Sequence, residues 1–111
     1  MTDATRQVLE GLVREHRVLL FMKGSRHFPM CGFSAKTVEV LTATGTDFQT
    51  VNVLADPAIR SGIKEFGNWP TIPQLYVDGQ LVGGCDIVTE LAESGELARL
   101  LEPPGAADQR G

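Results

Sequence analysis

The chain has 111 residues, of which 42% are hydrophobic and 22% are charged, a composition typical of one ordinary globular domain. Ten basic residues against fourteen acidic ones leave a net charge of −4, and no dense basic patch indicates a nucleic-acid binder. The two cysteines, Cys31 and Cys85, are too few for a disulfide scaffold or for a four-cysteine site built by one chain.

We expect no export or membrane-spanning segment in this sequence. Its N-terminus has no basic stretch followed by an apolar run, and it lacks the arginine-rich pattern of a transit peptide. The longest apolar run covers only residues 18–22, far too few to span a bilayer. We therefore expect a cytoplasmic protein without a membrane or nucleic-acid partner, in which a cysteine is a free thiol, a redox group or a metal ligand.

The first half of the chain predicts helices that alternate with strands. In order, the pattern predicts a helix over about 4–15, a strand over 18–22, a loop over 23–30, a helix over about 32–42, a strand over 48–53 and a helix over 57–66. The continuous apolar run of the first strand is typical of a strand covered on both faces. Asp56 and Pro57 are the residue types expected at the cap and first position of the third helix.

The second half predicts a hairpin and two more helices. In order, we expect a strand over 74–77, a turn at Asp78-Gly79, a strand over 80–82, a helix over about 87–93 capped by Asp86, and a short helix capped by Ser94 that ends at Leu101. A βαβ unit followed by a hairpin gives an α/β fold, with a small mixed sheet flanked by helices on both faces. Residues 1–101 form the domain, and we expect 102–111 to be a flexible tail.

Cys31 stands at the junction of a Gly- and Pro-containing loop with a predicted helix. Unpaired N–H groups and the partial positive charge of a helix N-terminus favour a thiolate there. A buried apolar role for the cysteine is the alternative. Ser34 occupies the position at which a Cys-x-x-Cys motif would carry its resolving thiol, which excludes dithiol chemistry at this helix. Cys85 stays open as a distant resolving thiol, and the Ser34 hydroxyl is expected to bond locally within the first turn.

Two further segments have features of a binding site. The Ile72-Pro73 bond precedes a strand and, if it is cis, exposes the backbone of Ile72 to an extended ligand, although residue pattern alone does not decide the isomer. The run Gly83-Gly84-Cys85-Asp86 permits close backbone approach and can present helix N–H groups to a carboxylate. A plain turn with an aspartate cap is the alternative interpretation of this second segment.

Taken together, these residues resemble the monothiol glutaredoxins of the Cys-Gly-Phe-Ser type. The resemblance runs from about Val18 to Leu91 and rests on four motifs in order, namely 21–24 (FMKG), 31–34 (CGFS), 68–77 (NWPTIPQLYV) and 83–88 (GGCDIV). It implies a thioredoxin fold with a four-stranded sheet, a cis bond before Pro73 and glutathione binding. The segment Arg26 to Met30 departs from the pattern of many relatives, which puts partner choice in doubt but removes no expected ligand.

The resemblance also assigns roles to individual residues. Cys31 is the expected catalytic residue and cluster ligand. The expected glutathione-binding residues are Lys23 and Arg60 for the glycine carboxylate, Phe33, the backbone at Ile72 beside Pro73 for the cysteine part, and Cys85 with Asp86 for the γ-glutamyl end. Lys64, by contrast, is interpreted as part of a solvated helix face.

A shared iron–sulfur site would explain how one useful cysteine can suffice. A [2Fe-2S] cluster needs four ligands, typically thiolates. Cys31 from each of two chains and one glutathione per chain would supply them, so the resemblance implies a homodimer bridged by the cluster. The expected function is transfer of the cluster to iron–sulfur acceptor proteins, and BolA-type proteins are expected partners in this family.

Two other functions remain open at this point. The first is a glutathione-dependent thiol–disulfide oxidoreductase that removes glutathione from proteins with Cys31 as its sole nucleophile, which needs no second cysteine at position 34. The second is a redox-inert binding module on the same fold.

Overall fold

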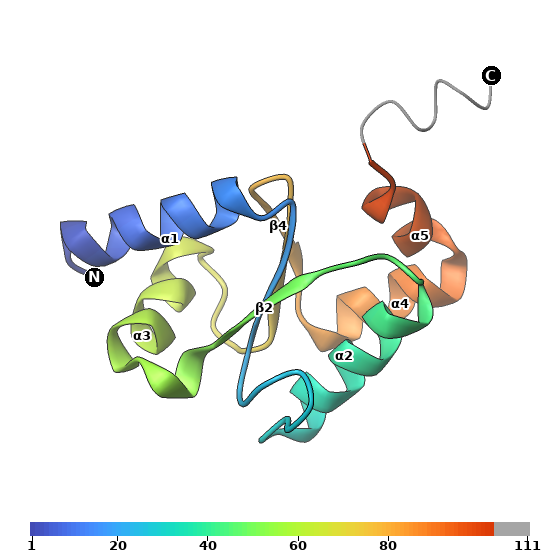
Figure 1. Ribbon diagram of the computed structural model, residues 1–111, viewed down its shortest axis with the longest axis horizontal. Helices are drawn as coiled ribbons and strands as arrows, with labels where there is room; N and C mark the ends of the chain where they lie inside the picture. Colours follow the sequence, from blue (N-terminus) through green and yellow to red (C-terminus); the bar gives the residue numbers. More distant parts are fainter. Residues whose placement is uncertain (104–111) are drawn as a thin grey trace.

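The computed structural model describes residues 1–103, and its helices and strands follow the predicted order (Figure 1). The elements are α1 (Asp3–Glu15), β1 (Val18–Met22), α2 (Gly32–Ala43), β2 (Gln49–Asn52), the 3-10 helix η1 (Val53–Ala55), α3 (Pro57–Phe66), β3 (Gln74–Val77), β4 (Gln80–Gly83), α4 (Cys85–Ser94) and α5 (Glu96–Leu101). Across the described residues, no helix is both long and apolar enough to cross a membrane. Residues 104–111 of the expected tail lie outside the described residues.

The strands form one mixed sheet in the order β2-β1-β3-β4. β1 runs parallel to β2, as the intervening helix α2 requires, and antiparallel to β3. β3 and β4 form the predicted hairpin around Asp78-Gly79, with Tyr76 opposite Leu81. The four-stranded mixed sheet with helices on both faces is the predicted thioredoxin architecture.

Alternate residues of β1 supply two separate cores, which confirms that both faces of this strand are covered. Leu20 and its neighbours two positions away pack with α2, α4 and α5, whereas Leu19 and Phe21 pack with α1 and α3. All five residues of β1 are buried. Figure 1 shows the two helix layers on either side of the strands, with α1 and α3 in one and α2, α4 and α5 in the other. The ends of the central strands are thereby held rigidly beside the loops that follow them.

The predicted Asp56 cap is confirmed, and a side chain also caps the first helix. The Thr2 hydroxyl accepts from the Thr5 N–H at 3.1 Å and caps α1. The Asp56 carboxylate accepts from the N–H groups of Ala58 and Ile59, with Pro57 at the first position of α3.

The caps expected for the last two helices are wrong, by two residues for α4 and by one residue for α5. The helix α4 begins at Cys85 with Gly84 as its N-cap, so Asp86 lies inside the first turn. The N-cap of α5 is Gly95, whose left-handed φ of 83° ends α4 and starts α5. Ser94 is instead the last residue of α4, although its hydroxyl still accepts from the Glu96 N–H at 3.3 Å. The boundary between α4 and α5 falls at Gly95 because this position needs a positive φ, which glycine adopts without strain and serine does not.

Candidate functional site

Cys31 is the N-cap residue of α2, and its side chain remains partly exposed. The pKa of this thiol lies below its ordinary value. The main cause is the backbone N–H of Ser34 in the first turn of the helix. Partial burial opposes this effect, while the N–H of Phe33, the charge of Lys23 and the Ser34 hydroxyl add to it. Cys31 therefore occupies the predicted position that favours a thiolate. Its partial exposure excludes the alternative of a fully buried apolar cysteine.

A tightly bonded loop, residues 23–31 and here called the Cys31 loop, delivers this sulfur to the helix. Met30 donates its N–H to the carbonyl of Lys23 at 2.9 Å, and Ser25 and Phe28 exchange backbone hydrogen bonds of 3.2 and 3.1 Å. At its base, Gly24 has a left-handed φ of 88° and donates its N–H to the Asn52 side chain at 2.9 Å. These bonds fix the path of the chain that leads to Cys31.

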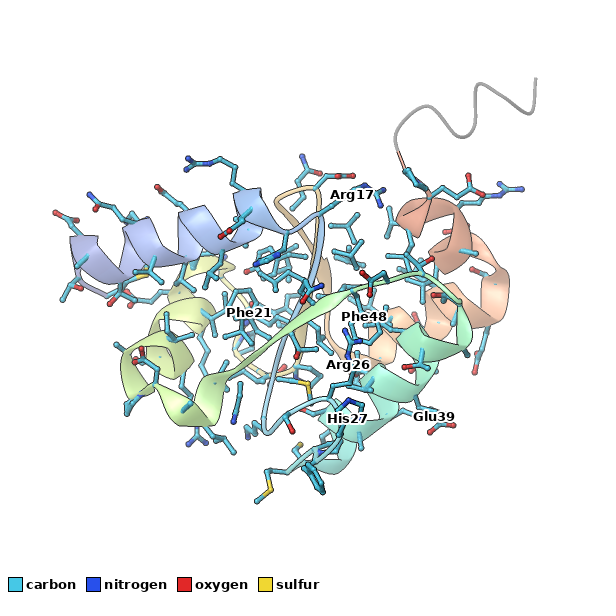
Figure 2. The ribbon with its side chains drawn as sticks, viewed as in Figure 1. Arg17, Phe21, Arg26, His27, Glu39 and Phe48 are labelled. Atoms are coloured by element: carbon cyan, nitrogen blue, oxygen red, sulfur yellow. The ribbon has the colours of Figure 1, made fainter. Side chains whose placement is uncertain are left out.

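Arg26 anchors the outer part of the Cys31 loop to the entrance of β2. Its guanidinium lies 4.0 Å from the ring centroid of Phe48 and also donates to the Phe48 carbonyl. Figure 2 shows Arg26 beside Phe48, with His27 next to them at the loop. The loop leaves Phe28 and Met30 strongly exposed, at 77% and 71%. The Arg26–Met30 departure therefore shapes the approach to Cys31.

Ser34 connects the loop to the helix in addition to the expected local bond, which its hydroxyl makes with Cys31. Its hydroxyl is buried and accepts from the Lys23 N–H at 3.1 Å, across eleven residues of sequence. Spacing from Cys31 alone does not indicate this bond, because it depends on how the loop folds back. The same hydroxyl also lowers the Cys31 pKa, so Ser34 has both a structural and an electrostatic effect.

The opposite side of the site is the segment Trp69–Pro73, here called the cis-proline wall. The Ile72–Pro73 peptide bond is cis, as the family resemblance implied. Residues of this wall line a groove of about 580 Å³ together with Cys31. The groove is bounded by residues from the Cys31 loop, α2, α3, the wall and the start of α4, namely Lys23, Cys31, Phe33, Lys64, Trp69, Pro70, Thr71, Ile72, Pro73, Gly84, Cys85, Asp86 and Ile87.

Seven of the eight predicted site residues lie along this groove, and Arg60 does not. Arg60 is exposed on α3, whereas Lys64, one helical turn later, lines the groove. Lys64 is exposed, as a solvated helix face requires, and it also borders the groove. An i, i+4 pair of cations on a helix indicates a shared face, but only the position of α3 shows which member reaches the groove.

A second hollow, of about 700 Å³, adjoins the first between α2 and α4. The two hollows share Cys31, Phe33, Cys85 and Asp86. Both cysteines are free thiols. Phe33 is 64% exposed beside the sulfur of Cys31, so the cysteine is reached from an open surface.

The charges along the groove suit an extended ligand with carboxylates and an amino group. Lys23 and Lys64 provide cations on one part of the lining, and Asp86 provides an anion in the first turn of α4. The N-terminus of α4 also presents unpaired N–H groups. Within residues 1–103, no group of three or more His, Cys, Asp or Glu side chains is gathered to hold a metal ion. This part of the chain therefore offers a thiol with a lowered pKa and a binding groove, not a complete metal centre.

A partly exposed cysteine with a lowered pKa at a helix N-terminus, facing a cis-proline wall on a thioredoxin fold, defines a glutaredoxin-type thiol protein. A family profile described as glutaredoxin matches residues 18–82. A curated relative from Synechocystis, named as an uncharacterized monothiol glutaredoxin ycf64-like, is 50% identical over 102 residues and covers 92% of this chain and 95% of that protein. The chain belongs to the glutaredoxin family, in its monothiol, single-domain class.

Two further comparisons agree with this membership. The mitochondrial monothiol glutaredoxin-5 of Saccharomyces cerevisiae is 53% identical over 105 residues, which cover 92% of this chain and 70% of that protein. The solution structure of reduced apo GrxS14 from poplar superposes with a TM-score of 0.75 at 47% identity, covering 85% of this chain and 86% of that one. The fold predicted from the sequence is confirmed.

Proposed function

We propose that this monothiol glutaredoxin binds glutathione in the groove and carries a [2Fe-2S] cluster bridged between two copies of the chain. The observation that carries the proposal is Cys31 itself, an accessible and thiolate-favouring cysteine beside a groove with charges for a tripeptide. Lys23 and Lys64 would take carboxylates of glutathione, and Asp86 would take its amino group. The role assigned to Arg60 remains a prediction, since it lies outside the groove lining.

The residues present fit a cluster whose ligands are shared. Thiolates are the ligands that iron–sulfur clusters prefer, and Cys31 offers one with a lowered pKa. Since the described chain gathers no complete ligand set, a second copy and two glutathione thiols would complete the four. Two of the ligands would then be small molecules that exchange, which suits a carrier that gives its cluster to acceptor proteins.

The expected partners and location follow from this chemistry. We propose iron–sulfur acceptor proteins and BolA-type proteins as partners, because the open surface beside Cys31 leaves the ligand thiol accessible to another protein. We propose the cytoplasm as the location, since both cysteines are free thiols and a reducing compartment keeps them so.

A second function is favoured by the lowered pKa of Cys31. The Cys31 thiolate would attack the glutathione sulfur of a glutathionylated protein, forming a Cys31–glutathione disulfide and releasing the protein thiolate. Free glutathione would then attack that disulfide, which yields oxidised glutathione and returns the Cys31 thiolate. Both steps are thiol–disulfide exchanges, so no other oxidant or reductant is needed.

Anaerobic reconstitution tests the proposed function. The full chain is incubated with iron, sulfide and glutathione, and its visible spectrum and oligomeric state are recorded. We expect charge-transfer absorbance in a dimer that depends on glutathione, is lost in Cys31→Ser and is retained in Cys85→Ser. A colourless monomer that removes glutathione rapidly from a protein disulfide would overturn the carrier and support the oxidoreductase.

A further inference from the structure

Gln74 is a polar residue in the middle of the apolar framework, and the proposed function makes no use of it. It is the first residue of β3, an interior strand, and its side chain is fully buried on the sheet face covered by α1 and α3. An amide buried without hydrogen bonds costs folding free energy, so each of its contacts has a physical reason. Those contacts lead directly to the groove.

The amide nitrogen of Gln74 holds two carbonyl groups of the cis-proline wall. Nε2 donates to the Trp69 carbonyl at 3.0 Å and to the Thr71 carbonyl at 3.2 Å. Because carbonyl oxygens only accept, these neighbours fix which end of the amide is nitrogen. The other end, Oε1, accepts from the Tyr76 hydroxyl at 3.0 Å.

The surroundings keep this amide in one place. Tyr76 is buried, and its ring meets Phe21 edge to face at 5.5 Å between centroids, so its hydroxyl has little freedom to move. Gly67 leaves the space that the two polar groups occupy. A Cβ at that position would lie 2.3 Å from the Tyr76 hydroxyl and 3.0 Å from Gln74 Oε1.

We infer that Gln74 is a positioning residue that sets the shape of the cis-proline wall and thereby the affinity of the groove for glutathione. The two carbonyls it holds bracket Pro70, and Trp69, Pro70 and Thr71 all line the groove. Ile72, whose backbone is expected to pair with the cysteine part of glutathione, follows directly. The inference rests on the proposed function, because it takes glutathione as the occupant of the groove.

Thiol–disulfide equilibria separate this positioning effect from a general loss of structure. The full chain is equilibrated with oxidised glutathione or with bis(2-hydroxyethyl) disulfide, and the mixed disulfide at Cys31 is quantified by mass spectrometry. Glutathione carries the carboxylates and amino group that the groove would bind, whereas the hydroxyethyl group carries none of them. The ratio of the two equilibrium constants therefore measures the contribution of the groove, and the intrinsic reactivity of Cys31 cancels.

Gln74→Glu and Gln74→Met both keep the side-chain length while removing the donor to the two carbonyls. We expect each to lower the ratio by about tenfold, because the two hydrogen bonds that hold the wall are lost and the wall is no longer fixed for glutathione. Tyr76→Phe is the matched control, since it removes the bond to Oε1 and leaves both bonds to the wall. We expect it to change the ratio by less than about twofold.

The single tryptophan of the chain gives a direct readout of the wall. We expect the fluorescence anisotropy of Trp69 to decay faster in both Gln74 variants than in the wild type or in Tyr76→Phe. A wild-type ratio in a folded Gln74 variant, or an equal fall in both equilibrium constants, would overturn the inference alone. A wild-type protein with no preference for glutathione would overturn the proposed function and the inference together.

Discussion

The two sides of the groove are held in place by different kinds of contact. The Cys31 loop is a surface structure, fixed by backbone hydrogen bonds among its own residues and by a few contacts with Phe48, Asn52 and Ser34. The cis-proline wall is instead held from the core by the fully buried side chain of Gln74. Its amide nitrogen donates to the wall, and its amide oxygen accepts from the Tyr76 hydroxyl. Only the bond between Tyr76 and Gln74 is fully buried, where water does not compete for the donor or the acceptor. We therefore expect the reactivity of the thiol and the shape of its binding groove to respond to separate substitutions.

Gly24→Ala should cause the largest loss of stability and should act on the Cys31 loop. Its φ of 88° is strained for alanine, and the added Cβ would lie 2.5 Å from the Phe28 carbonyl oxygen and 2.6 Å from the Met30 nitrogen. Strain and overpacking together predict a loss of about 4 kcal/mol in the free energy of unfolding, measured by urea denaturation.

Gly11→Ala is the matched control for that substitution. Gly11 lies within α1, and a Cβ there would meet no atom within 4 Å. Since alanine favours a helix over glycine, we expect a gain of up to about 1 kcal/mol. Equal losses of stability in the two variants would contradict the conclusion that the backbone conformation and close contacts of Gly24 require a glycine.

Sequence patterns revealed the Cys31 side of the groove better than the wall side. The position of Cys31 at a helix start follows from local residue types, because caps and breaks act over a few neighbours. The burial of Gln74 and the bond from Lys23 to Ser34 join segments that are distant along the chain or set by the turn of the loop. The choice of Lys64 over Arg60 likewise depends on how α3 lies against the wall, which spacing within one helix does not reveal.

Gly67→Ala should be the second most disruptive change and should act on the wall. Its φ is ordinary, at −88°, so the cost arises from the contact of 2.3 Å between the added Cβ and the Tyr76 hydroxyl. The tyrosine ring is packed against Phe21 and Phe66 and has no room to withdraw. We expect a loss of about 3 kcal/mol in unfolding free energy.

A double-mutant cycle tests the cause of that loss. In the Tyr76→Phe background the clashing oxygen is absent, so Gly67→Ala should cost at least about 1 kcal/mol less than it does in the wild type. Additive losses would show that the Tyr76 hydroxyl is not what excludes a side chain at position 67.

Alkaline pH should destabilise the whole protein through Tyr76, the buried partner of Gln74. Burial raises the pKa of this phenol from 10.0 to about 12. The folded protein therefore keeps the proton more tightly than the unfolded chain does, and the stabilisation present below pH 10 is lost as the pH rises towards 12. We expect a loss of about 2 kcal/mol in unfolding free energy over this range that is absent in Tyr76→Phe. Identical pH profiles for the two proteins would contradict a buried, hydrogen-bonded phenol.

Ser34→Ala should have the smallest effect on stability but a specific effect on the thiol. The Lys23 N–H loses its acceptor, which predicts a loss of about 1 kcal/mol. The Ser34 hydroxyl is also one cause of the lowered Cys31 pKa, so its removal should raise that pKa. The rise is partial, because the backbone N–H of Ser34 remains and contributes more. At pH 7 less thiolate is then present, and alkylation of Cys31 by iodoacetamide should be slower.

Thr37→Val separates the electrostatic effect of Ser34 from its structural one. Thr37 is also buried in α2, and its hydroxyl donates to the Phe33 carbonyl at 2.8 Å, so its loss should destabilise the helix by a similar amount. Its hydroxyl is not among the causes that lower the Cys31 pKa, so the pH profile of alkylation should stay at the wild-type position. If both variants shift the profile equally, the shift reflects loosening of α2. If only Ser34→Ala shifts it, a residue that cannot act as a resolving thiol still tunes the reactivity of Cys31.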